Sequence, residues 1–260
     1  MQTDAVSELI VDVAARLILP RYRRLRPDEI DLKGPGDLVT VADREAEAEL
    51  SAAFSARHPG ALIVGEEATH ARPGLVAGLP DAEHAWVIDP VDGTNNFARG
   101  GPDFGVMVAE LRSGEVVRSW IWQPVHRRLF VSERGSGVTC NGVPLERLRP
   151  PGDPIRGNVP RRLRRDAVPG FDLRPSARSC AIDYPFLLLG VIDVLAYRHH
   201  RPWDHAAGAL MVTELGGFSA AHPGIPWRPG VQGPVLMSAS SPELWRRADA
   251  ALVAGRALDG

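Results

Sequence analysis

Two aspartates stand close together in the stretch WVIDPVDGTNNF, which covers residues 86–97. Asp89 follows a run that is hydrophobic on successive residues, and Asp92 comes three residues later. Because such continuous apolar runs are typical of strands buried on both faces, we expect the end of this strand to be shielded from water. The sequence has no lysine or arginine between Arg72 and Arg99. Buried carboxylates need a cationic partner, and a hard divalent cation such as Mg²⁺ suits a site made of oxygen ligands.

Gly93 and Thr94 follow at once and add a second chemical function. A glycine that leads into a short helix leaves backbone N–H groups pointing outward, and such groups bind anions such as phosphate. One short stretch therefore combines carboxylates for a metal with amides for a phosphate. The pattern predicts metal-assisted phosphate chemistry.

Three further acids, Asp43, Glu66 and Asp204, lie at the ends of apolar segments. Each also has a purely structural interpretation. Asp43 completes the pattern of a helix capping box that begins at Thr40. Asp204 would favour the positive N-terminus of its helix, and Glu66 would be a solvated loop charge. Taken singly, these structural interpretations are favoured, so the evidence for a site comes first from the two aspartates of 86–97.

The elements that must position these residues mix helices and strands without regular βαβ alternation. Apolar residues spaced by three and four predict helices, whereas short apolar runs bounded by glycine and proline predict strands. The expected helices cover 6–18, 43–57, 182–189, 203–215 and 242–253, and the expected strands cover 61–65, 86–89, 104–111, 116–123, 128–133 and 194–198, with two more near 218 and 235. We expect layered sheets and helices rather than a Rossmann fold.

Residues 149–175 are predicted to form mostly loop, with at most one strand, because proline and glycine cluster there. This region is the best candidate for a boundary between two halves. The N-terminal α+β half, 1–148, carries most of the candidate metal ligands. The C-terminal α/β half, 149–260, carries Asp204 and the substrate-facing residues. The two halves are expected to form one compact catalytic unit.

The composition excludes several classes of protein. A net charge of −2 argues against nucleic-acid binding, since nucleic-acid-binding chains are usually basic. The longest apolar run, 186–192, is too short to span a bilayer, and acidic residues interrupt the apolar N-terminus, which argues against a membrane protein and a signal peptide. Two cysteines without a metal-binding spacing favour a reduced, cytoplasmic protein.

Four motifs resemble, in order and rough spacing, those of the inositol monophosphatase family of Mg²⁺-dependent, lithium-sensitive phosphatases. They are DLVTVAD at 37–43, GEE at 65–67, WVIDPVDGTNNF at 86–97 and PWDHAAGALMVTELGG at 202–217. The resemblance covers most of the chain. It implies an α+β fold, the layered αβαβα sandwich of the inositol monophosphatase and fructose-1,6-bisphosphatase type. It also implies a homodimer that acts on a small phosphorylated metabolite.

The same resemblance implies a site for two to three Mg²⁺ ions. Carried over by position, one ion takes Glu66, Asp89 and the carbonyl oxygen of Val91 as ligands. A second ion takes Asp89 together with Asp92 and Asp204. A third, weaker ion lies near Glu66 and is held through water.

The catalytic roles are implied by the resemblance as well. Thr94, oriented by Asp43, and Glu66 position the attacking water and take up its proton. The backbone of Gly93 and Thr94 binds the phosphate. The water attacks phosphorus directly, so the reaction needs no covalent intermediate.

The substrate-facing positions depart from the family pattern. Inositol phosphatases usually place a glutamate seven residues before the aspartate of the W-D motif, where this chain has Tyr197 with Arg198 beside it. Asp183 stands where many bacterial members have an acid, and it could bind a substrate hydroxyl or amine or serve only as a helix N-terminal acid. Residues 198–201, RHHR, are predicted to form a solvated or interface loop, because the family's metals do not use histidine. His205 is predicted to pack.

We therefore expect a Mg²⁺-dependent phosphomonoesterase that hydrolyses a small polyol or sugar phosphate, such as inositol 1-phosphate, by attack of a metal-activated water. Alternatives within this class are a histidinol-phosphate phosphatase, whose substrate amine would suit Asp183, a fructose-1,6-bisphosphatase and a 3'-phosphoadenosine nucleotide phosphatase. The alternative from another class is a non-catalytic family member that binds RNA or transcription machinery. Retention of the whole set of five acids and one threonine argues against it.

Overall fold

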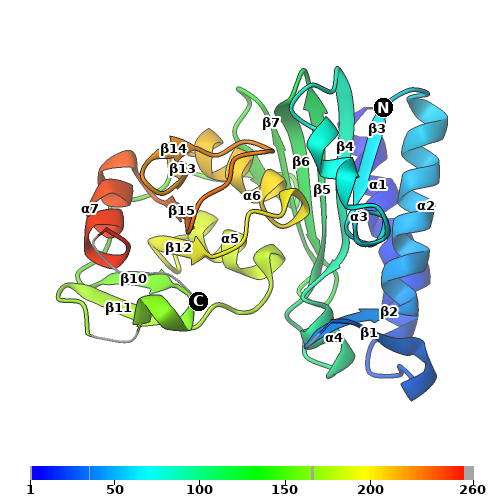
Figure 1. Cartoon of the computed structure of the whole chain (residues 1–260), viewed down its shortest axis with the longest axis horizontal. Coiled ribbons are helices and arrows are strands. Elements are labelled where there is room, and N and C mark those ends of the chain that lie inside the picture. Colours follow the sequence, from blue (N-terminus) through cyan, green and yellow to red (C-terminus); the bar gives the residue numbers. More distant parts are fainter. Residues whose placement is uncertain (1, 35, 165–166, 255–260) are drawn as a thin grey trace.

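Two large β-sheets lie side by side, with helices between them and outside them (Figure 1). The computed structural model describes residues 2–34, 36–164 and 167–254. The large sheets have seven and six strands, and a small two-stranded sheet joins β1 (Ile30–Gly34) to β2 (Asp37–Thr40). Within the described ranges, no helix has both the length and the apolar character needed to cross a membrane.

The seven-stranded sheet follows the chain order from β3 to β9. Strands β3 and β4 run parallel, and each later pair runs antiparallel. The strands are β3 (Leu62–Gly65), β4 (His84–Asp92), β5 (Gly105–Arg112), β6 (Glu115–Gln123), β7 (Arg128–Glu133), β8 (Val138–Cys140) and β9 (Val143–Pro144). The predicted meander over 104–133 is confirmed, because short turns join β5, β6 and β7.

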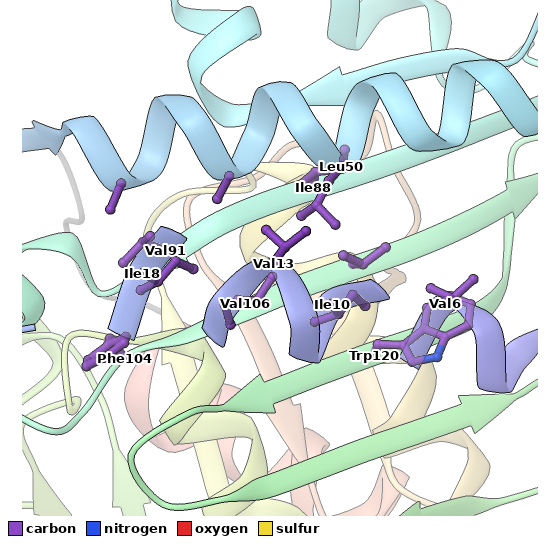
Figure 2. Packing of buried hydrophobic residues seen from close by; sticks show 14 of the residues in the cluster. Val6, Ile10, Val13, Ile18, Leu50, Ile88, Val91, Phe104, Val106 and Trp120 are labelled. Carbon is purple, nitrogen blue, oxygen red and sulfur yellow. The ribbon is translucent and has the colours of Figure 1, made fainter. Parts of the chain in front are cut away.

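One face of this sheet is covered by α1 (Thr3–Val13) and α2 (Val41–Arg57). A π-helical turn, Ala14–Ile18, prolongs α1. The apolar spacing over 6–18 is therefore the stripe that the first helix buries against the sheet. Figure 2 shows the buried residues Val6, Ile10, Val13 and Ile18 from this helix, Leu50 from α2, and Ile88, Val91, Phe104, Val106 and Trp120 from the sheet and the loop that enters it.

A middle layer of helices separates the two large sheets. It consists of α5 (Cys180–Leu188) and α6 (Pro202–Glu214), which lie between the sheets in Figure 1. Their apolar residues pack against the second face of the first sheet in one continuous core. That core includes Met107, Ile121 and Phe130 from the sheet and Tyr184, Leu187, Ala207 and Met211 from the helices.

The six-stranded sheet has the order β11-β10-β12-β15-β13-β14. Its strands are β10 (Ile155–Asn158), β11 (Phe171–Arg174), β12 (Val194–Tyr197), β13 (Phe218–Ala221), β14 (Ile225–Pro226) and β15 (Leu236–Ala239). Helix α7 (Pro242–Leu252) covers its outer face through Leu244, Trp245 and Ala248. The layers therefore follow the order α, β, α, β, α, and the expected layered α+β fold is confirmed.

The region 149–175 differs from its prediction as mostly loop. It contains two strands, β10 and β11, which pair in parallel, and a 3₁₀ turn, Arg161–Arg164, between them. Strand β10 also pairs with β12, which places it inside the second sheet. Each of these strands has only four residues, which is too short to show a clear alternation of apolar and polar side chains. The prolines and glycines nearby therefore dominate the sequence pattern and indicate loop. The division of the chain at residue 148 stays a prediction.

Candidate active site

Three aspartates meet where the first sheet faces the middle helices. Asp89 and Asp92 come from the end of β4, and Asp204 comes from the first turn of α6. One carboxylate oxygen of each lies within 4.8 Å of the others. All three side chains are buried. The structure thus brings together residues that lie more than a hundred positions apart in the sequence.

A β-bulge aims the two aspartates of β4 at the same place. Asp89 pairs with Met107 and Asp92 pairs with Gly105, so the register shifts between the two aspartates. In a regular strand, residues at positions i and i+3 point to opposite faces of the sheet. The extra residue of the bulge changes this alternation, as bulges beside active sites often do. The strand consequently reaches Asp92, beyond the expected end at 89.

Burial and mutual repulsion make this cluster costly without a cation. Burial, followed by the charge of Glu66, raises the pKa of Asp89 well above its ordinary value. Burial and the charge of Asp204 raise the pKa of Asp92 to about 7. A divalent cation would reverse these shifts, because it favours the ionised carboxylates. The donor set consists of oxygens, which fits a hard cation such as Mg²⁺.

Glu66 is the fourth acid of the site and opens the short helix α3 (Glu66–Ala71), directly after β3. Burial raises its pKa to about 8 despite the opposing effect of Lys33. The Lys33 Nζ atom lies 2.6 Å from Glu66 Oε1 and 2.8 Å from Glu67 Oε1, and its side chain is only 5% exposed. The interpretation of Glu66 as a solvated loop charge is therefore wrong. Lys33, the single lysine of the chain, lies outside the stretch 72–99 that surrounds the two aspartates in sequence, and it reaches the site only in the fold.

Asp43 has both of the roles that its sequence position allowed. Its Oδ2 atom accepts hydrogen bonds from the backbone N–H of Thr40, at 2.9 Å, and from the Thr40 hydroxyl, which completes the capping box of α2. Its Oδ1 atom lies 2.9 Å from Thr94 Oγ1. The Thr94 hydroxyl also lies 3.0 Å from the carbonyl oxygen of Val91, and it can donate to only one of the two acceptors at a time. Burial raises the pKa of Asp43 to about 6.

Gly93 precedes the short helix α4 (Thr94–Ala98) and has a left-handed backbone, with φ of 86°. A Cβ atom at this position would lie 2.9 Å from the carbonyl oxygen of Asp103 and 2.9 Å from Ser179 Cβ. Both the backbone angle and the close packing therefore require glycine here. The turn places Thr94 beside Asp43 and directly after the bulge.

The second half of the chain holds Asp92 in place. Its Oδ2 atom accepts hydrogen bonds from the hydroxyl of Ser179 and from the N–H of Ala181, the latter at 2.7 Å. Ser179 and Ala181 lie at the N-terminal end of α5. Asp92 is thus oriented by a helix that belongs to the other half of the molecule.

Asp183 is completely buried and interacts with the protein's own donors. Its Oδ1 atom accepts from Asn158 Nδ2 at 2.8 Å and from the N–H of Ala177 at 3.0 Å. Its Oδ2 atom accepts from the hydroxyls of Ser176 and Tyr197, the latter at 2.6 Å. Asp183 and Tyr197 therefore anchor the segment that leads to α5, a role that was not foreseen. Direct contacts of these two residues, or of the exposed Arg198, with a substrate stay predictions.

His199 lies in the loop 198–201, which is predicted to be solvated or at an interface, and it contacts the aspartate cluster. Its Nδ1 atom lies 3.1 Å from Asp204 Oδ2. Burial is the largest influence on Asp204 and raises its pKa, but the contact and charge of His199, together with the charges of His205 and Arg201, outweigh it, so the pKa lies below its ordinary value. His205 packs as predicted. It is fully buried between Tyr184 and the backbone of His199, and burial lowers its pKa to about 3.

Comparisons with known proteins agree with this arrangement. The family model described as "Inositol monophosphatase family" matches residues 2–254. The inositol-1-monophosphatase of Mesorhizobium japonicum is 35% identical over 222 residues, which cover 79% of this chain and 80% of the relative. The Nus factor SuhB of Pseudomonas aeruginosa is 32% identical over 229 residues, which cover 80% of this chain and 83% of the relative.

Solved structures show the same similarity. The crystal structure of the extragenic suppressor protein SuhB from Bartonella henselae superimposes with a TM-score of 0.75 at 26% identity. The match covers 97% of this chain and 100% of the Bartonella henselae chain. The layered fold is therefore shared over nearly the whole length of both proteins.

Proposed function

Because this chain belongs to the inositol monophosphatase family, we propose that it is a Mg²⁺-dependent phosphomonoesterase acting on a small polyol or sugar phosphate such as inositol 1-phosphate. The observation that carries the proposal is the buried cluster of Asp89, Asp92 and Asp204, whose carboxylate oxygens lie within 4.8 Å of one another. Such a cluster is unfavourable for a protein alone and favourable around a hard cation.

In this proposal Glu66, Asp89 and the carbonyl oxygen of Val91 hold one ion. Asp89, Asp92 and Asp204 hold a second. When bound, the ions lower the pKa of a water ligand and stabilise negative charge on the phosphate oxygens. Lys33 Nζ lies 2.6 Å from Glu66 Oε1, so any ion that takes Glu66 as a ligand, or lies near it, would compete with this lysine.

The protein's own groups then have distinct tasks. Asp43 accepts the hydrogen bond of Thr94 and fixes the hydroxyl oxygen of Thr94 toward the attacking water. Glu66 takes up the proton of that water. The backbone N–H groups of Gly93 and Thr94 bind the phosphate at the start of α4. Gly93 and Thr94 directly follow the bulge between Asp89 and Asp92, so the proposed phosphate-binding amides are adjacent to the proposed metal ligands.

The test is phosphate release from a panel of esters: inositol 1-phosphate, histidinol phosphate, fructose 1,6-bisphosphate and 3'-phosphoadenosine 5'-phosphate. Each is assayed with Mg²⁺, with EDTA, and with Mg²⁺ plus Li⁺. We expect Mg²⁺-dependent release that Li⁺ inhibits, with one ester preferred. Absence of release from every ester by folded, metal-loaded protein would overturn the proposal in this form.

A substitution of Asp92 supplies the matched control. Asp92→Asn keeps the shape of the side chain but removes the charge shared by the second ion. We expect turnover to fall about a hundredfold or more. Turnover close to that of the original protein would mean that Asp92 does not contribute to a metal site.

A second candidate is a family member that binds RNA or transcription machinery without catalysis. The 32% identity to a relative named Nus factor SuhB favours it. Asp92→Asn separates the two candidates, because a binding role would survive the loss of the charge. Pull-down with transcription complexes and gel-shift with RNA, compared between the original protein and Asp92→Asn, measure that role.

The resemblance also leads us to propose a cytoplasmic homodimer. Light scattering coupled to size-exclusion chromatography tests the assembly. A mass near twice that of the chain, which is 28.1 kDa, is the expected result, and a mass near that of one chain would contradict it.

A further inference from the structure

Glu47 is a buried acid on α2 that none of the roles above uses. Its side chain is only 5% exposed. Its Oε2 atom accepts a hydrogen bond from the N–H of Glu67 at 2.8 Å, and its Oε1 atom accepts one from the N–H of Ala68 at 2.7 Å. Both oxygens of one carboxylate therefore bind two successive backbone amides at the beginning of α3.

Helix α3 needs such a partner. The first N–H groups of a helix lack acceptors within the helix, and the residue that precedes α3 is Gly65, which has no side chain to cap them. A helix of six residues is also too short to be stable by itself. A carboxylate facing a helix N-terminus makes strong, charge-assisted hydrogen bonds. Glu47 thus supplies from α2 the cap that α3 does not carry.

Gly65 has to be glycine for the same reason. Its φ is −97°, which any residue can adopt. A Cβ atom at this position, however, would lie 2.2 Å from the carboxyl carbon of Glu47 and 2.4 and 2.5 Å from its two oxygens. The absence of a side chain at Gly65 is what lets the carboxylate reach the amides.

We propose that Glu47 is a positioning residue for the metal site, acting through Glu66. One of the two amides that Glu47 holds belongs to Glu67, the residue next to Glu66, so the capped turn fixes the backbone from which the Glu66 side chain extends. One turn earlier on α2, Asp43 accepts the hydrogen bond of Thr94. A single helix therefore contacts both the Thr94 hydroxyl and the turn that carries Glu66. The inference rests on the proposed metal-dependent function.

The test is the affinity for Mn²⁺, measured by electron paramagnetic resonance on the full-length protein without substrate. Glu47→Gln keeps the size of the side chain but leaves an NH₂ group facing one of the two amides. Gly65→Ala leaves Glu47 unchanged but adds a methyl group that pushes the Glu47 carboxylate away from the two amides. We expect each change to weaken Mn²⁺ binding about ten- to a hundredfold, as is usual when a group that orients a metal ligand is lost.

Glu49→Gln is the matched control. Glu49 lies on the same helix, and its side chain is 37% exposed and pairs with Arg16 on the surface. We expect its Mn²⁺ affinity to equal that of the original protein. Equal loss in the Glu49 and Glu47 variants would mean that any change of charge on α2 weakens the site, and the proposal would fail.

A double-mutant cycle with Glu66→Gln distinguishes positioning from general destabilisation. If Glu47 acts through Glu66, then Glu47→Gln causes no further loss of Mn²⁺ affinity when Glu66 is already replaced. Additive losses, or a lower melting temperature with unchanged Mn²⁺ affinity, would overturn the proposal.

If the original protein binds no Mn²⁺ at all, the proposed metal-dependent function fails first. If Glu47→Gln does not fold, Gly65→Ala decides the question by itself.

Discussion

At the scale of single residues, burial raises the pKa of two acids of the site. Asp92 and Glu66 have ordinary pKa values of 3.8 and 4.5, and the structure raises them to about 7 and about 8, with burial as the largest cause. The metal-free protein therefore holds protons on these groups that the unfolded chain releases. Proton binding and metal binding compete for the same oxygens.

This competition predicts how stability depends on pH. An acid whose pKa is raised by folding stabilises the folded state fully below its unfolded pKa, and this contribution disappears as the pH rises through the folded pKa. For Asp92 and Glu66 the window runs from about pH 4 to about pH 8. We expect the melting temperature of the EDTA-treated protein to fall between about pH 5 and about pH 8.

Mg²⁺ should reverse this fall, since it binds the ionised carboxylates of the folded state. Its stabilising effect should therefore be larger at the alkaline end of the window. Differential scanning fluorimetry across the pH range, with EDTA or Mg²⁺, measures both effects. Asp92→Asn is the control, and its metal-free fall should be shallower. A melting temperature without pH dependence would contradict the assignment of these buried acids.

Several residues of the site could not be predicted from sequence because their partners are distant or locally invisible. Asp89 and Asp92 follow from their motif and from the apolar strand before them, whereas Asp204 follows from its motif alone. Lys33 does not, because it lies on β1, more than thirty positions before Glu66, and meets Glu66 only in the folded chain. His199 does not either, because a histidine in a polar loop carries no sign of the aspartate it will contact.

At the scale of elements, the site depends on two irregular features of the backbone. One is the bulge that ends β4 between Asp89 and Asp92, and the other is the left-handed turn at Gly93. Apolar periodicity predicted the long helices and the central strands correctly, because those elements bury a repeating face. It does not predict a bulge, nor strands of four residues such as β10 and β11, because neither repeats long enough to show a pattern.

The turn at Gly93 gives a prediction with a matched control. Gly60 also has a left-handed backbone, with φ of 92°, but a Cβ atom there would have nothing within 4 Å. Gly60→Ala should therefore cost only the backbone term, about 1 kcal/mol of the free energy of unfolding. Gly93→Ala adds contacts of 2.9 Å with Asp103 and Ser179 and should cost at least about twice as much. Urea denaturation measures both, and equal losses would mean that the close packing at Gly93 is unimportant.

At the scale of the whole molecule, the two halves share the site and a core. Asp92 of the first sheet is oriented by Ser179 and Ala181 of α5, and Asp204 reaches the cluster from α6. The core between the sheet and these helices joins Met107 and Phe130 to Tyr184 and Met211. Part of the apolar surface of each half is thus buried against the other half, so we predict one cooperative unit rather than two independent domains.

Cooperative unfolding is the prediction that follows. Cys180 lies in α5 and is 3% exposed, and in a Cys140→Ser background its reaction with a thiol reagent reports the opening of the middle layer. With Trp203, Trp227 and Trp245 replaced by phenylalanine, tryptophan fluorescence reports only on Trp86, Trp120 and Trp122 of the first sheet. We expect both signals to change at the same urea concentration, and Mg²⁺ to shift both equally, because the proposed ions join carboxylates from both halves. Exposure of Cys180 well before the fluorescence changes would show that the second half opens alone, and the division at residue 148 would then mark two separately stable domains.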